Sequence, residues 1–202
     1  NEIEVSEALQ IGYLDLGGAT ILIGGTLYPY DITDITGLEY FTNLKELNLS
    51  NKNIAVIDAT PFIHLEVLNC GNPNTPLSSP LTTLNVTGLA NLQNLRCVGA
   101  TLLTSVDVST LTNLTDLWFI YTGISSLDVS NLTNLWRLDC SYSQLTSIDV
   151  SNNINLLRLY FRENQITSLD VSNLNYLTTL NCSNSSNLTY INMKNGSIEN
   201  SS

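Results

Sequence analysis

Apolar residues return along this chain at a nearly constant interval. The phrase Leu-x-x-Leu-x-(Leu/Cys/Phe) occurs seven times, and its successive starts are 21, 27, 22, 21, 21 and 21 residues apart. The first leucines are Leu44, Leu65, Leu92, Leu114, Leu135, Leu156 and Leu177. The alternation in Leu-x-Leu is the two-residue period of a β-strand. Because repeated units of this size bury their apolar face only against their neighbours, the pattern predicts a solenoid.

A second apolar phrase follows about ten residues after each first one. It begins at Ile54, Leu81, Leu103, Ile124, Leu145, Ile166 and Leu188. Neither phrase carries the longer 3.6-residue period that an amphipathic helix requires. We therefore expect a mostly β solenoid with little helix, in which each coil has two short extended segments joined by turns of Ser, Thr, Asn and Gly.

The regularity of the repeat divides the chain into three parts. Residues 44–193 carry about seven repeats and form the predicted solenoid. Residues 1–43 contain partial half-repeats at 11–16 and 32–35 and are interpreted as an N-terminal cap, because solenoid ends must cover the core. Residues 194–202 form a polar tail. The longest repeat contains the segment GNPNTPLSSP (71–80), whose prolines predict a loop.

The repeat resembles the leucine-rich repeat family, and within it the short bacterial class with nested half-repeats, called IRREKO-type. The best match is LWRLDCSYSQLTSIDVSNN at 135–153, in which Ser143 stands where Asn is usual. The resemblance covers about residues 44–193. It implies parallel strands, binding as the general role, and a bacterial protein that is secreted or held at the cell surface. It names no ligand.

Charge limits the partners of this chain. Only 12% of its residues are charged and the net charge is −11. Nucleic acids and anionic membranes are therefore unfavourable partners, because phosphate binding requires clustered Lys and Arg. No apolar run approaches the roughly 20 residues of a membrane span. An overall acidic chain would favour a partner that is basic overall.

The cysteines and the single histidine give no sign of catalysis. Cys70, Cys97, Cys140 and Cys182 all occupy the third apolar position of the strand phrase. Only Cys70 and Cys97 stand on adjacent coils, and pairs two coils apart are too distant for a disulfide. We expect four reduced core thiols. His64 has no second base with which to form a nucleophilic triad, so an enzyme is not predicted.

Two polar columns repeat with the coils. One precedes the first leucine of each phrase and consists of Asn43, His64, Asn91, Asn113, Asn134, Asn155 and Tyr176. We interpret it as a structural ladder, since Asn side chains can hydrogen-bond to turn backbone. The other consists of Asp58, Asn85, Asp107, Asp128, Asp149, Asp170 and Asn192. We expect its members to accept hydrogen bonds from the turn that follows, as Asx-turns.

Calcium is an alternative partner at two places. Adjacent carboxylates of the Asp column could share calcium ions, which prefer oxygen ligands. The opening residues NEIEVSEA also resemble the back half of an EF-hand-like calcium loop, with Glu7 as its last ligand and Asn1 where Gly is usual. The leading ligand positions of such a loop are missing from this sequence. No cofactor is therefore predicted, and calcium stays an alternative.

The inward positions of the strand phrase stay apolar, whereas its outward positions vary in charge and polarity. The outer repeats carry small polar residues there, whereas the middle repeats carry charged and aromatic residues. The candidate binding residues are Asp116, Trp118, Tyr121, Arg137, Asp139, Tyr142, Arg158, Tyr160, Arg162 and Glu163. Because the coils stack in register, we expect Asp116, Arg137 and Arg158 side by side. Trp118 and Tyr160 should flank Asp139.

These residues lead to a functional hypothesis. Trp, Tyr and Arg are the types enriched at binding hot spots. We predict a non-enzymatic recognition module that binds a protein or peptide through the sheet face of repeats three to six, with its arginines meeting acidic groups of the partner. Two alternatives are a glycan-binding surface, with sugar rings stacked on Trp118 and Tyr160, and a structural spacer of a larger surface protein. The same residues could also form ordinary cross-strand pairs.

Overall fold

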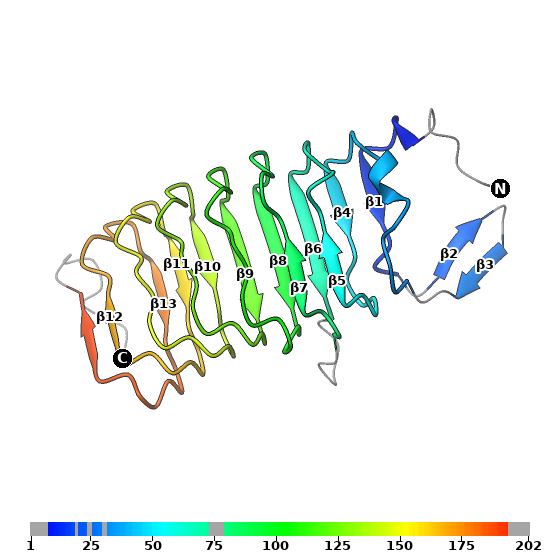
Figure 1. Ribbon diagram of the computed structural model, residues 1–202. Helices are drawn as coiled ribbons and strands as arrows, with labels where there is room; N and C mark the ends of the chain where they lie inside the picture. Colours follow the sequence, from blue (N-terminus) through cyan, green and yellow to red (C-terminus); the bar gives the residue numbers. More distant parts are fainter. Residues whose placement is uncertain (1–7, 19, 24–25, 30–31, 73–78, 194–202) are drawn as a thin grey trace.

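Eight parallel strands, one from each successive coil, form the main sheet in the computed structural model (Figure 1). The structure describes residues 8–18, 20–23, 26–29, 32–72 and 79–193. The strands, in sheet order, are β1 (Tyr13–Asp15), β4 (Glu46–Asn48), β6 (Val67–Gly71), β8 (Asn94–Val98), β9 (Asp116–Ile120), β10 (Arg137–Asp139), β11 (Arg158–Tyr160) and β13 (Thr179–Asn181). The predicted solenoid of parallel strands with little helix is confirmed.

The second apolar phrase of each coil lines the opposite side of the solenoid. It forms two pairs of parallel strands, β5 (Val56–Asp58) with β7 (Thr83–Asn85) and β12 (Ser168–Asp170) with β14 (Tyr190–Asn192). In the three coils between them the second phrase forms no strand. We expected two extended segments in every coil, but on this second side only the coils near the two ends of the solenoid form strands. Beyond β7, a hollow of about 390 Å³ is lined by Thr82, Thr83 and Leu84 together with residues 105–107 of the next coil.

The N-terminal part joins the main sheet. Its half-unit at residues 11–16 supplies β1, which pairs with β4 so that Leu14 lies opposite Leu47. It also contains the antiparallel hairpin of β2 (Thr20–Ile23) and β3 (Thr26–Pro29), and a single 3-10 turn, η1 (Leu38–Tyr40). The suggested calcium loop at residues 1–7, the polar tail and most of the predicted loop at 71–80 lie outside the described residues.

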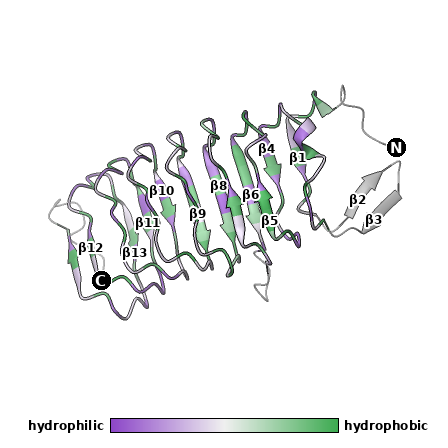
Figure 2. Cartoon of the chain, in the orientation of Figure 1, coloured by the Kyte–Doolittle hydropathy of each residue, from purple (hydrophilic) through white to green (hydrophobic). Residues whose placement is uncertain are grey.

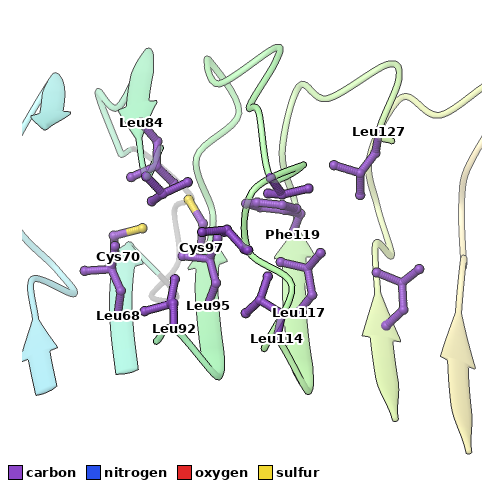
Figure 3. Close-up of a cluster of buried hydrophobic side chains, with 14 of the residues drawn as sticks. Leu68, Cys70, Leu84, Leu92, Leu95, Cys97, Leu114, Leu117, Phe119 and Leu127 are labelled. Carbon is purple, nitrogen blue, oxygen red and sulfur yellow. The ribbon is translucent and has the colours of Figure 1, made fainter. Parts of the chain in front are cut away.

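The core is a continuous column of apolar side chains between the two sides of the solenoid. Hydrophobic positions recur in every coil along its length (Figure 2). Leucines from both phrases and Phe119 point into this shared interior, as the close-up around Cys97 shows (Figure 3). Phe119 and Phe161 are completely buried. The inward direction predicted for the leucine positions is confirmed.

The cysteines follow the prediction with one difference. All four are free thiols, and Cys70 lies opposite Cys97 on the neighbouring strand. Burial raises the pKa of the Cys140 thiol above its ordinary value. Cys182 is only half-buried, because it belongs to the last strand of the sheet and lacks a following neighbour there; burial raises its pKa to about 11. These thiols are packing residues, as the sequence predicted.

The Asp column forms the predicted Asx-turns. In five coils the carboxylate accepts the backbone N–H two residues later, at 2.9 to 3.2 Å. Asn85 and Asn192 also donate to the carboxylates of Asp58 and Asp170 in the preceding coil, which explains why an amide can replace a carboxylate there. These contacts account for the column without an ion, and the calcium alternative stays a prediction.

The Asx-turns predict a pH dependence of stability. Two hydrogen bonds from Ser151 lower the pKa of Asp149 and keep its carboxylate ionised in the fold. The bond from the backbone N–H has the larger effect, and the bond from the hydroxyl has the smaller one. The unfolded chain therefore takes up a proton first as the pH falls, starting near the ordinary Asp pKa of about 3.9. The stabilisation from this ionised carboxylate is present above that pH and is lost as the pH drops through the folded pKa.

The comparison with Asp149→Asn isolates this effect from the overall charge. The variant keeps an oxygen acceptor for Ser151 but cannot titrate. We expect the free energy of unfolding of the natural protein, minus that of Asp149→Asn, to decrease between pH 6 and pH 3 in urea titrations. A difference that stays constant or grows on acidification would contradict the assignment.

Candidate binding surface on the main sheet

The sheet register brings the predicted residues together. Arg137 lies opposite Asp116 on one side and Arg158 on the other. Asp139 likewise lies between Trp118 and Tyr160. Both predicted juxtapositions are confirmed. The local reason is the strand alternation, which buries the leucine between each pair of outward residues and leaves its neighbours on the outer face.

Arginine and aromatic side chains alternate across four strands of this face. The guanidinium carbon of Arg96 on β8 lies 4.4 Å from the centre of the Trp118 ring, and that of Arg137 on β10 lies 3.9 Å from it. Arg137 also lies 5.3 Å from the ring centre of Tyr160 on β11. We call Arg96, Trp118, Arg137 and Tyr160 the arginine–aromatic strip. Cation–π contacts of this kind hold long side chains in fixed positions.

Two buried carboxylates contact residues of the arginine–aromatic strip. Asp116 is almost completely buried and accepts a hydrogen bond from the indole N–H of Trp118. Asp139 is also buried; it accepts the backbone N–H of Ser141 at 3.1 Å and lies 3.6 Å from Arg137. That distance is longer than the 2.7–2.9 Å of a strong charge-assisted hydrogen bond. Arg137 therefore makes no strong hydrogen bond to Asp139, and its terminal N–H groups can still meet a ligand.

The surface is locally basic within an acidic protein. Its charged residues are Arg96, Arg137, Arg158 and Arg162 against Asp116, Asp139 and Glu163, a local net charge of +1 where the whole chain carries −11. Among the described residues, the Arg137–Asp139 contact is the only ion pair of an arginine. The Nε atoms of Arg96, Arg137 and Arg162 are buried without a hydrogen-bond partner. The remaining exposure of these half-buried side chains therefore lies beyond Nε.

Two tyrosines stack at the ends of β9 and β10. The rings of Tyr121 and Tyr142 are 4.2 Å apart and nearly parallel, and the guanidinium of Arg162 lies 5.3 Å from the Tyr142 ring. Both tyrosines have left-handed backbone, with φ of 55° and 58°. Sister coils carry Asn51 or Asn184 in this conformation, which bulky residues adopt at a cost of roughly 1–2 kcal/mol. Strain of this kind is typical of functional positions.

The remaining candidates lie at the margin of the strip. Glu163 has φ of 54° and accepts a hydrogen bond from Asn184, so it bonds along the solenoid. Arg158 is exposed and its guanidinium lies 5.4 Å from the ring of Trp136, which precedes β10. Arg158 thus contacts an aromatic ring outside the strip, although its backbone lies beside Arg137.

Arg96 and Trp136 are missing from the predicted set. Arg96 stands at an outward position of its phrase, and the register places it opposite Trp118, but its repeat has no other charged or aromatic outward residue. Trp136 directly follows the first leucine of its repeat, where inward and outward positions cannot be assigned by alternation alone. The described residues contain no group of three His, Cys, Asp or Glu side chains able to hold a metal. They also contain no helix with the length and hydropathy of a membrane crossing.

Solved structures of known proteins share this architecture. No protein-family model and no curated protein matches the chain. The functional domain of InlJ from Listeria monocytogenes, described as including a cysteine ladder, matches 93% of this chain with 30% identity and a TM-score of 0.60. Such solved structures are all leucine-rich repeat proteins. The chain is a leucine-rich repeat protein.

A second leucine-rich repeat structure supports the fold alone. Internalin C2 from Listeria monocytogenes strain 4b F2365 matches 93% of this chain with 22% identity and a TM-score of 0.61. The chain spans 45% of the InlJ chain and 73% of the internalin C2 chain. The predicted short-repeat subclass stays a prediction.

Proposed function

We propose that this leucine-rich repeat protein is a non-enzymatic recognition module that binds an acidic peptide segment of a partner protein. The binding surface is the arginine–aromatic strip together with the tyrosine stack, which lie on repeats three to six. We also propose that the protein is bacterial and is secreted or held at the cell surface. The likeness to InlJ from Listeria monocytogenes supports both proposals.

The observation that carries the proposal is the placement of Trp118 between Arg96 and Arg137. Each guanidinium has one face against the indole, so its remaining donors are held in place before a ligand arrives. Less side-chain freedom is then lost on binding, which strengthens affinity. Planar guanidinium groups bind carboxylates in two-pronged geometry. A segment that combines Asp or Glu with apolar side chains matches both features.

The geometry disfavours the glycan alternative at this place. A sugar ring would need a free face of the Trp118 indole, but the arginines of both neighbouring strands lie over that ring. The spacer alternative explains neither the strained tyrosines nor the clustering of all four arginines of the chain on one face. The left-handed tyrosines cost stability, and a protein that only separates other domains does not require its arginines on one face.

Substitution of Trp118 tests the proposal. The probes are synthetic peptides that combine Asp or Glu with Phe or Leu, each paired with a version in which Asn or Gln replaces the acids. We expect Trp118→Ala to weaken binding of the acidic peptides by about 30-fold, since a hot-spot residue contributes about 2 kcal/mol. Isothermal titration calorimetry measures the change. The matched control is Tyr190→Ala, a 59% exposed aromatic residue on β14, outside the main sheet.

Two outcomes would contradict the proposal. One is that the natural protein binds none of the acidic peptides. The other is that Trp118→Ala binds them as tightly as Tyr190→Ala does. If the acidic peptides and their amide versions bind equally, the surface still binds peptides but the proposed role of the arginines is wrong.

A further inference from the structure

A second surface feature runs along the edge where the chain enters the strands of the main sheet. There the Asn column donates side-chain N–H groups to backbone carbonyls of the preceding coil. Asn91, Asn113, Asn134 and Asn155 bond to the oxygens of Ile63, Ala90, Thr112 and Thr133 at 2.8 to 3.0 Å. This confirms the predicted structural ladder. It also fixes a row of exposed amides whose carbonyl oxygen and second N–H remain available.

These amides line a groove that crosses several coils. One hollow of about 590 Å³ is lined by Glu66, Asn91, Gln93, Asn113, Thr115, Asn134 and Asn155. A second hollow of about 490 Å³ shares Glu66 and Asn91 with the first and extends past Lys45 to Asn43 and His64. We call the two together the asparagine groove. Together they are lined by residues of six successive coils, an arrangement that suits an extended ligand.

The groove is polar but nearly neutral. Its carboxylate, Glu66, accepts a hydrogen bond from the ammonium of Lys45 at 2.9 Å, so the two charges compensate each other. The other lining groups are amides, one hydroxyl and an imidazole. Each amide offers both a donor and an acceptor, which matches hydroxyl groups that also donate and accept. An anionic ligand would find no cluster of cations there, and a cation would find no unpaired cluster of carboxylates.

An indole ring stands at the C-terminal end of this groove. The backbone N–H of Trp136 bonds to the carbonyl of Thr115, which bonds in the same way to Gln93, so Trp136 occupies the next position of the row that lines the groove. The half-buried indole has the guanidinium of Arg158, from the following coil, over its ring. The lining reaches Asn155 on the asparagine side, whereas on the other side Trp136 follows Gln93 and Thr115 in their row. A polar groove with an aromatic ring next in the row along one side suits a ligand with hydroxyl edges and an apolar face.

We propose that the asparagine groove binds a neutral oligosaccharide, whose terminal ring stacks on Trp136 and whose hydroxyl groups bond to the amides. Pyranose rings combine C–H faces with hydroxyl edges, whereas a peptide would need apolar pockets for its side chains, and the lining supplies none. This site is separate from the arginine–aromatic strip. It moves carbohydrate recognition from Trp118, where arginines of two neighbouring strands lie over the ring, to Trp136, where the arginine of one neighbouring coil does.

The two tryptophans provide matched controls for each other. The probes are neutral hexasaccharides of glucose, mannose and N-acetylglucosamine, and saturation-transfer NMR with titration measures their binding. We expect at least one probe to bind the natural protein. Trp136→Ala should weaken that binding about fivefold or more, as expected for an aromatic contact of about 1 kcal/mol. Trp118→Ala should leave it unchanged.

A second variant keeps the test independent of folding. The side-chain amide of Gln93 makes no hydrogen bond to any described residue. We therefore expect Gln93→Ala to have the same melting temperature as the natural protein and to bind the sugar more weakly. The proposal is overturned if no probe binds at millimolar concentration, if Trp136→Ala and Trp118→Ala bind equally, or if only neutral peptides occupy the groove. Failure here leaves the acidic-peptide proposal standing, because that proposal depends on Trp118 and not on Trp136.

Discussion

Phe119→Ala is expected to lower the free energy of unfolding by about 3–5 kcal/mol. Phe119 lies on β9 directly beneath the arginine–aromatic strip and is completely buried. The corresponding position of the two neighbouring coils holds the smaller Cys97 and Cys140, so this column offers no large side chain to fill the space. The loss is large against the 5–15 kcal/mol that usually stabilises a domain.

The Phe119→Ala substitution should also change the shape of the unfolding transition. In a solenoid each coil is stabilised by its two neighbours, so a cavity at β9 weakens the contacts on both sides of one coil. Urea titration followed by circular dichroism is expected to show a lower midpoint and a broader or divided transition. Tyr190→Ala, which removes an exposed aromatic ring, should change stability by no more than about 0.5 kcal/mol. A loss below 1 kcal/mol for Phe119→Ala would contradict this packing.

Gly71→Ala is expected to destabilise the protein by about 3 kcal/mol or more. Gly71 ends β6 with φ of +85°, a conformation that costs other residues roughly 1–2 kcal/mol. A Cβ at this position would also stand 2.3 Å from the carbonyl oxygen of Val98 on the paired strand β8. Because that atom is backbone, it can move only if the β6–β8 pairing shifts, which adds a strain of about 1–3 kcal/mol.

Gly88→Ala separates these two contributions. Gly88 has nearly the same φ, +80°, but a Cβ there would have no atom within 4 Å. It should therefore show only the conformational cost of roughly 1–2 kcal/mol. The difference between the two variants in chemical denaturation measures the cost of the collision. Equal losses would show that β6 and β8 can separate without cost.

The repeating positions could be predicted because the same residue types recur at them in every coil. The inward leucines and the Asn ladder depend on contacts between adjacent coils, the Asx-turns depend on contacts within one coil, and seven copies of the phrase make all of these positions recognisable. The register of Asp116, Arg137 and Arg158 follows from the same regularity. Cys182 departs from its column because it lies on the last strand of the sheet, a position that the repeat itself does not encode.

The contacts of long side chains could not be predicted in the same way. Arg96 was missing from the candidate surface because the reach of a guanidinium over Trp118 depends on rotamers, not on spacing. Arg158 was expected within the surface, but its side chain contacts Trp136 instead. The left-handed backbone of Tyr121 and Tyr142 was signalled only indirectly, by Asn and Gly in the same column of sister coils.

The sequence by itself determined the solenoid, its period and the face on which the repeats differ, because each of these depends on short-range alternation and on repetition. Only the tertiary structure decided which arginine lies on which ring, where strand pairing on the second side is lost, and that Trp118 and Trp136 contact different arginines. Those outcomes depend on side-chain rotamers and on the separation of neighbouring coils. The stacking of the coils fixes the position of every Cβ, whereas the contacts made by the ends of long side chains depend on their rotamers.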